Sequence, residues 1–154
     1  MISILITNYN KEKYLNKNLN LLLKSSLKNF EIILFDDVST DNSLEIIEKF
    51  KKVKIIKNKK KKFTSPALNQ IFGISKCLKK AKGELICLLD SDDFFDKNKL
   101  KIIQDFFLKN KKKTAFIIFQ LQMYKNLNLN KKNQIIFGQQ FFQQVVFLLE
   151  KKQW

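Results

Sequence analysis

The chain has 154 residues, of which 45% are hydrophobic, and its thirty lysines outnumber fourteen acidic residues to give a formal net charge of +16. This length and composition predict a globular domain with a buried core and exclude a disordered or collagen-like chain. Neither His nor Arg occurs, which excludes Ser-His-Asp and Cys-His catalysis, His-ligated zinc and bidentate guanidinium contacts to phosphate.

The first part of the chain alternates apolar runs with an amphipathic pattern. Residues 2–6 form a nearly continuous apolar run, which is typical of a strand buried on both faces of a parallel sheet. Apolar residues at three- and four-residue spacing then predict a helix over residues 12–24. Residues 30–35 predict a second strand, residues 39–42 have helix-capping side chains, and residues 53–56 predict a third strand. The helix between the last two strands should carry on its inner face Leu44, Ile47 and Phe50.

The pattern continues through the middle of the chain. A helix is predicted over residues 66–80, with Pro66 in its first turn and Gly83 just past its end. Residues 84–89 predict a fourth buried strand, and Asp96 is placed to cap a helix that ends near Lys109. Its apolar residues are Leu100, Ile103, Phe106 and Phe107. A fifth strand is predicted over residues 114–121.

After residue 121 the pattern becomes irregular. Residues 125–134 are rich in Asn and Lys and predict a loop, and residues 137–149 predict a helix that lacks a clean apolar stripe. We therefore expect a domain over residues 1–121 and a tail over residues 122–154. The alternation of strands and helices predicts an α/β fold with a mostly parallel, Rossmann-like sheet flanked by helices. In such sheets, ligands bind at the carboxyl ends of the strands.

Acidic residues gather where two of the predicted strands end. Five of the eight aspartates directly follow the second and fourth strands, and they are Asp36, Asp37, Asp90, Asp92 and Asp93. Clustered carboxylates repel one another, so they usually hold a cation or a hydrogen-bonding ligand. The Asp-x-Asp spacing of Asp90 and Asp92 lets two hard oxygen ligands face one Mg²⁺ or Mn²⁺ ion. With Thr7 and Tyr9 at the end of the first strand, they outline a nucleotide site.

Three segments carry a resemblance to a known family. Residues 3–10 read SILITNYN, residues 29–43 read NFEIILFDDVSTDNS, and residues 81–93 read AKGELICLLDSDD. In this order and at this spacing they resemble family 2 glycosyltransferases of the GT-A fold, over residues 1–110. The resemblance implies a metal-dependent enzyme that transfers a sugar from a nucleotide sugar, expected to be UDP-linked, to a hydroxyl of a glycan or lipid-linked acceptor. The expected course is inversion at the anomeric carbon.

The resemblance also implies roles for individual residues. Thr7 and Tyr9 lie against the nucleotide base, and the Asp37 carboxylate accepts a hydrogen bond from the uracil N–H. Asp90 lies beside the ribose and the metal. Asp92 coordinates the Mg²⁺ or Mn²⁺ ion that neutralises the leaving diphosphate.

The sequence departs from the family pattern in two places. Many relatives carry a cation for the diphosphate before the fourth strand, but residues 63–72 contain none, so residues 59–62 or Lys76 are the candidates to replace it. The family's general base lies roughly a hundred residues beyond the Asp-x-Asp motif, whereas only 61 residues follow Asp93. No catalytic residue is therefore assigned, and the acceptor half is expected to be missing. We expect the chain to be either a truncated or frame-disrupted gene product or a donor-binding half that needs other parts.

Two other functions are compatible with the sequence. The chain would be an inactive donor-binding remnant if the missing half were required, or a basic module that binds nucleic acid or an anionic membrane through lysine. The basicity is regional, because residues 1–50 hold six lysines and seven acidic residues, whereas residues 51–154 hold twenty-four and seven. The lysines lack interleaved stacking aromatics, so we expect no specific nucleic-acid partner.

The expected location is cytoplasmic, with the inner face of the membrane as the alternative. The two cysteines, Cys77 and Cys87, are too few and too far apart for a disulfide framework. The first residues lack a signal-peptide pattern. We expect both cysteines to be small buried residues.

Overall fold

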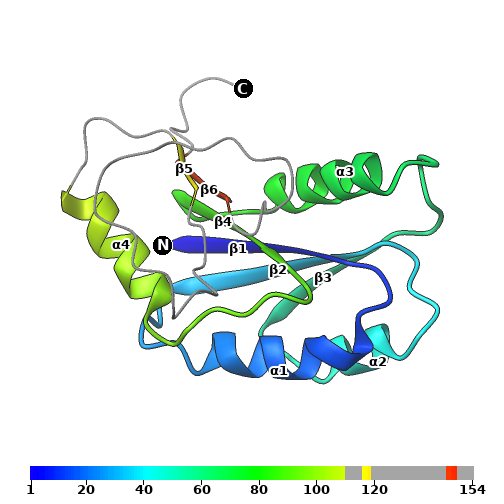
Figure 1. The fold of residues 1–154 in the computed structure, drawn as a ribbon, viewed down its shortest axis with the longest axis horizontal. Helices are drawn as coiled ribbons and strands as arrows, with labels where there is room; N and C mark the ends of the chain where they lie inside the picture. Colours follow the sequence, from blue (N-terminus) through cyan, green and yellow to red (C-terminus); the bar gives the residue numbers. More distant parts are fainter. Residues whose placement is uncertain (110–115, 119–144, 149–154) are drawn as a thin grey trace, which may run out of the picture.

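A computed structural model describes residues 1–109, 116–118 and 145–148, which form an α/β fold around one sheet (Figure 1). The strands are β1 (Ile2–Asn8), β2 (Phe30–Asp36), β3 (Val53–Lys57), β4 (Leu85–Asp90), β5 (Phe116–Ile118) and β6 (Val145–Leu148). Their order across the sheet is β3-β2-β1-β4-β6-β5. The first four of these are mutually parallel, whereas β6 runs antiparallel to both β4 and β5. The predicted mostly parallel α/β fold is confirmed.

Helices cover both faces of the sheet. In the described part of the chain they are α1 (Glu12–Leu23), α2 (Ser43–Glu48), α3 (Pro66–Leu78) and α4 (Lys99–Lys109). Helices α1, α2 and α4 pack on one face and α3 packs on the other (Figure 1). None of these helices has both the length and the apolar character needed to cross a bilayer.

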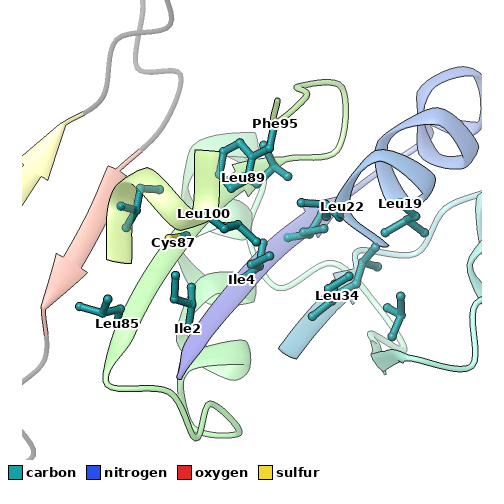
Figure 2. Close-up of a cluster of buried hydrophobic side chains, with 14 of the residues drawn as sticks. Ile2, Ile4, Leu19, Leu22, Leu34, Leu85, Cys87, Leu89, Phe95 and Leu100 are labelled. Atoms are coloured by element: carbon teal, nitrogen blue, oxygen red, sulfur yellow. The ribbon is translucent and has the colours of Figure 1, made fainter. Parts of the chain in front are cut away.

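The core has a large and a small part, one on each face of the sheet. Successive residues of a strand point to opposite faces, so Ile4 and Ile6 belong to the large cluster and Leu5 to the small one. This two-sided burial explains why the central strands β1, β2 and β4 are mostly apolar. In the large cluster, Leu19 and Leu22 of α1 lie over the sheet (Figure 2), and each buried leucine stabilises the fold by about 1.5–3 kcal/mol.

The structure corrects the prediction for the tail. Residues 145–148, predicted to be part of a helix over residues 137–149, form strand β6 instead. Their sequence is Val-Val-Phe-Leu, and β-branched and aromatic residues suit a strand that pairs with the edge of β4. The remainder of that predicted helix and the loop predicted over residues 125–134 lie outside the described residues.

Two residues expected on inner helix faces are not in the core. Phe106 is 40% exposed while Phe107 is buried, because adjacent residues point about 100° apart on a helix and only one can join Leu100 and Ile103. On α2, Leu44 is half-buried, and Ile46 packs against the large cluster with Ile47.

Gly83 has a different role from the predicted one at the end of a helix. Its φ is not positive, so no left-handed turn requires glycine here. Instead, a Cβ atom on Gly83 would lie 2.5 Å from Ser3 N and 2.8 Å from Ile2 C. Gly83 N also donates a hydrogen bond to Ser3 Oγ over 2.8 Å. Glycine therefore permits the close approach of the chain entering β4 to the start of β1.

Candidate functional site

The carboxyl ends of β1, β2 and β4 lie together at one edge of the sheet. In the strand register, Thr7 is opposite both Phe35 and Asp90, and Asn8 is opposite Asp36. The three sequence segments that carry the family resemblance therefore meet at this edge, although 83 residues separate Thr7 from Asp90. The residues predicted for the site come together here, and they are Thr7, Tyr9, Asp37, Asp90 and Asp92.

Asp36 organises the junction between β1 and the loop after β2. It is 1% exposed, and its Oδ1 accepts hydrogen bonds from Asn8 Nδ2 at 2.8 Å and from Ser39 Oγ at 2.6 Å. Its Oδ2 accepts one from Ser39 N at 3.0 Å. Val38 in the same loop has a φ of 61°, a strained value for a β-branched residue. These contacts fix the direction in which the chain leaves β2, and with it the position of Asp37.

The side of the site predicted to bind the base is formed by Asp37 and Tyr9. Asp37 is 9% exposed, its N donates to Asn8 O at 2.8 Å, and its Oδ1 accepts from Asn58 Nδ2 at 2.7 Å. Tyr9 is 43% exposed. The ammonium of Lys61 lies 3.2 Å from the centre of its ring, a cation–π contact. A partly exposed aromatic ring and a carboxylate held by Asn58 therefore follow the ends of the neighbouring strands β1 and β2, near half-buried Thr7.

The lysines considered for the diphosphate differ in position. Lys61 reaches Tyr9, whereas the ammonium groups of Lys62 and Lys76 lie 4.8 Å and 5.0 Å from the centre of the Phe72 ring. Of these three lysines, Lys61 is the one that contacts a predicted site residue.

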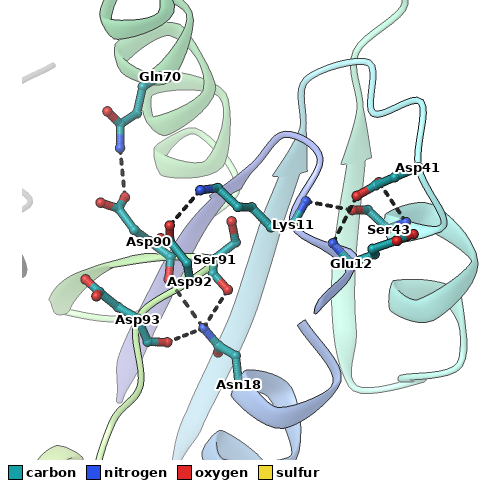
Figure 3. A network of polar contacts seen from close by, with 10 residues as sticks. All are labelled: Lys11, Glu12, Asn18, Asp41, Ser43, Gln70, Asp90, Ser91, Asp92 and Asp93. Carbon is teal, nitrogen blue, oxygen red and sulfur yellow. Dashed lines mark hydrogen bonds and ion pairs between the residues drawn. The ribbon is translucent and has the colours of Figure 1, made fainter. Parts of the chain in front are cut away.

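Asn18 of α1 hydrogen-bonds to the backbone of the turn over residues 90–93. The Asn18 side chain is 1% exposed, and its Nδ2 donates to Asp90 O and to Ser91 O, each at 3.3 Å, and to Asp93 O (Figure 3). An asparagine amide that is buried in an apolar helix face must be hydrogen-bonded to be tolerated. Asn18 thereby fixes the backbone that carries the Asp-x-Asp pair.

The two carboxylates of the pair have different partners. Asp92 Oδ2 accepts a hydrogen bond from Lys11 Nζ at 2.6 Å, and Asp90 Oδ1 accepts one from Gln70 Nε2 at 2.7 Å (Figure 3). The hydrogen bond to Asp92 raises the pKa of Lys11. Burial, and after it the charge of Asp92, raises the pKa of Asp90, while burial together with Asp90 and Asp92 raises the pKa of Asp93 to about 6. The burial and mutual repulsion of these carboxyl groups therefore disfavour negative charge at this turn.

Asp41 ties the starts of α1 and α2 together. Its carboxylate accepts hydrogen bonds from the backbone N–H groups of Glu12 and Ser43, each at 3.0 Å (Figure 3). Burial would raise the pKa of Asp41, but hydrogen bonds from Ser43 and Glu12 outweigh it and lower the pKa. Of residues 39–42, which were predicted to cap a helix, the N-cap residue of α2 is Asn42, and its side chain makes no capping hydrogen bond. Asp41 instead accepts from the first helical N–H groups of α1 and α2.

The carboxylates at the turn fit a divalent ion. Asp90 and Asp92 offer hard oxygen ligands from one turn, and a divalent cation would relieve their mutual repulsion. Across residues 1–109, 116–118 and 145–148, no three His, Cys, Asp or Glu side chains are arranged to hold a metal. The chain would therefore supply two carboxylates, and a bound diphosphate would supply further oxygens, the usual arrangement for Mg²⁺ with nucleotides.

Sequence reasoning missed four residues that position this site. Asn18 had a detectable signal, because it is a polar residue within the apolar stripe of α1 that includes Leu15, Leu19 and Leu22. Lys11 follows the first motif directly but was not distinguished from the other lysines. The other two are Asn58 and Gln70, and nothing in their spacing indicates that they contact Asp37 and Asp90.

A comparison with family models decides the assignment. The model described as Glycosyl transferase family 2 matches residues 3–152. The chain belongs to glycosyltransferase family 2. The resemblance seen in the three sequence motifs is therefore confirmed.

Two sequence relatives illustrate the similarity. An uncharacterized glycosyltransferase of Haemophilus influenzae is 42% identical over 118 residues, covering 71% of this chain and 43% of that protein. The poly(ribitol-phosphate) β-N-acetylglucosaminyltransferase TarS of Staphylococcus aureus is 35% identical over 101 residues, covering 64% of this chain and 17% of TarS. This family 2 chain thus spans less than half the length of these relatives.

Solved structures support the GT-A-like fold. TarS residues 1–349 in complex with UDP-GlcNAc match with a TM-score of 0.63 and 30% identity, over 71% of this chain and 32% of that one. The mannosyltransferase PcManGT of Pyrobaculum calidifontis, solved with GDP-Man and Mn²⁺, matches with a TM-score of 0.57 and 16% identity, over 69% of this chain and 32% of that one. The second likeness shows the fold alone.

Proposed function

We propose that this family 2 chain binds a UDP-sugar at the carboxyl edge of its sheet and forms the donor-binding part of an inverting glycosyltransferase. The acceptor would be a hydroxyl of a glycan or of a lipid-linked molecule. The observation that carries the proposal is the meeting of the three motif segments at the ends of β1, β2 and β4. The TarS relative, whose matched structure contains UDP-GlcNAc, supports a uridine nucleotide.

We assign recognition of the base to Thr7, Tyr9 and Asp37. Tyr9 offers an exposed ring for stacking, and Thr7 lies beside it on β1. Because Asp37 Oδ1 already accepts a hydrogen bond from Asn58, we assign Oδ2 to the uracil N3–H. A carboxylate at this position accepts from uracil but has no donor for the bare N3 of cytosine.

We assign a Mg²⁺ or Mn²⁺ ion to Asp92 and Asp90. When bound, the ion would act as a Lewis acid that neutralises the charge on the leaving diphosphate. Gln70 orients the Asp90 carboxylate through its hydrogen bond, and Asn18 holds the turn on which both carboxylates stand. No general base is assigned in this chain, so the proposal for these residues is donor binding.

A calorimetric titration of the chain with UDP in Mn²⁺ and then in EDTA tests the donor site. We expect binding in Mn²⁺ that is lost in EDTA, and a loss of at least about tenfold in affinity for Asp92→Asn. Asp105→Asn is the matched control, because it makes the same change in charge at an exposed position on α4. Its affinity should equal that of the unchanged protein.

UDP binding, together with assays of vesicle and nucleic-acid binding and of sugar transfer, separates the alternative functions. A basic module would bind anionic vesicles or nucleic acid equally well with Asp92→Asn, since its binding depends on lysine. Absence of UDP binding by the folded, unchanged protein would refute the donor site. UDP binding by a protein that neither hydrolyses a UDP-sugar nor transfers its sugar would identify a donor-binding remnant.

A change of base preference tests the role of Asp37. In Asp37→Asn, the amide oxygen can still accept from Asn58 while the new N–H faces the base. We expect UDP affinity to fall and the preference for UDP over CDP to decrease by at least about tenfold, because an N–H donor suits the cytosine N3. An unchanged preference would remove Asp37 from base recognition.

A further inference from the structure

Lys11 holds one of the two carboxylates assigned to the metal. Its Nζ lies 2.6 Å from Asp92 Oδ2, and the contact joins the start of α1 to the turn after β4, 81 residues away in the sequence. In Figure 3 the Lys11 side chain extends from the residue just before α1 toward Asp92. Both side chains are more than one third exposed, at 38% and 39%. The ion pair therefore lies where ligands from solvent can reach it.

The ammonium and a divalent ion would compete for the same oxygen. An ammonium at hydrogen-bond distance from Asp92 Oδ2 occupies that lone pair, and a second cation on the same carboxylate would be repelled by it. Asp90 differs, because the partner of its Oδ1 is the neutral amide of Gln70. Of the two carboxylates, Asp92 is thus the one that already carries a counterion.

We infer that Lys11 is a built-in competitor for the divalent ion, which couples metal binding to nucleotide binding. The inference rests on the proposed donor site. With Lys11 paired to Asp92, a divalent ion binds weakly in the absence of nucleotide, because it must displace the ammonium and finds few other ligands. A nucleotide diphosphate supplies further oxygens for the ion and negative charge near the displaced ammonium. The ion therefore binds well with the nucleotide and poorly without it.

The substitution Lys11→Met isolates this effect. The backbone contacts of residue 11 do not depend on its side chain, since its N donates to Ser43 Oγ at 3.1 Å and its O accepts from Tyr14 N at 3.0 Å. The start of α1 should therefore be kept. Lys13→Met is the matched control, because Lys13 is an exposed residue in the first turn of α1 and its loss changes the net charge equally.

The measurement is the dissociation constant of Mn²⁺, taken from water-proton relaxation, with and without UDP. A partly exposed ion pair contributes up to about 1 kcal/mol, so Lys11→Met should bind Mn²⁺ alone on the order of fivefold more tightly. The factor by which UDP strengthens Mn²⁺ binding should fall. Lys13→Met should leave both quantities as they are in the unchanged protein.

The outcomes distinguish the inference from the proposed function. The inference would be overturned if UDP strengthens Mn²⁺ binding to the unchanged protein but Mn²⁺ alone binds Lys11→Met no more tightly than the unchanged protein. The proposed donor site would then still stand. Equal tightening in Lys11→Met and Lys13→Met would also overturn it, because net charge would then be the cause. If Mn²⁺ binds Lys11→Met more tightly but UDP has no effect in either protein, competition at Asp92 stands and the proposed donor site fails.

Discussion

Asn18→Ala should weaken both the fold and the binding of a divalent ion at the proposed site. The Asn18 amide has two N–H protons shared among three carbonyl oxygens, so about two hydrogen bonds are lost at ~1 kcal/mol each. The carbonyls left without a donor at the turn add a further ~1 kcal/mol. The change also removes the partnerless, buried Asn18 Oδ1 and improves helix propensity, which together offset ~1 kcal/mol. The expected net loss is ~2 kcal/mol of unfolding free energy.

Urea unfolding followed by circular dichroism measures this loss, and the UDP titration in Mn²⁺ measures the effect on the site. The control is Asn20→Ala on the same helix, where the exposed amide donates only to Asn16 O and Oδ1. We expect its unfolding free energy to change by less than ~0.5 kcal/mol. If the two variants were equally stable, or if Asn18→Ala bound UDP and Mn²⁺ normally, the reasoning about the turn would be refuted.

Three further predictions concern the fold. Gly83→Ala should lower the unfolding free energy in urea more than Gly73→Ala does. The new methyl group would meet the backbone of Ser3 in Gly83→Ala but the side-chain ring of Phe35 in Gly73→Ala. The reverse order would contradict this packing. Burial alone would raise the pKa of Glu31, but hydrogen bonds from Lys54, Ser3 and Lys82 N outweigh it and lower the pKa below the usual 4.5. The stability advantage of the unchanged protein over Glu31→Gln should therefore be full above pH 4.5 and be lost as the pH falls through the lowered pKa. An advantage that did not decrease as the pH was lowered would contradict this. Burial raises the pKa of both Cys77 and Cys87 to about 12, so neither thiol should react with iodoacetamide at pH 8 until the protein unfolds.

The parallel part of the fold could be predicted because local and long-range requirements agree there. Strand β1 is buried on both faces, and its sequence from Ile2 to Ile6 is apolar except for Ser3. The helical spacing of Leu15, Leu19 and Leu22 matches one buried face of α1. For Val145–Leu148, the apolar run is compatible with either a helix or a strand. These residues form a strand because they pair with β4, which lies 55 or more residues away in the sequence.

The sequence predicted the carboxylates of the proposed site but not the side chains that hydrogen-bond to them. Asp37, Asp90 and Asp92 stand in motifs at the ends of strands, where the fold class alone places ligands. Lys11 and Gln70 reach Asp92 and Asp90 across 81 and 20 residues of sequence. Such contacts depend on how α1 and α3 pack against the sheet, and local patterns do not encode that packing.

Paramagnetic broadening of backbone amide signals tests the central proposal most directly. With UDP and Mn²⁺ bound, the account predicts the strongest broadening at residues 90–93 and at Lys11. With Mg²⁺ in place of Mn²⁺, UDP should shift the signals of Thr7, Tyr9 and Asp37, while Phe30 at the opposite edge of the sheet should be unaffected. Broadening centred elsewhere, or spread evenly over the exposed lysines, would contradict a nucleotide and metal site at the ends of β1, β2 and β4.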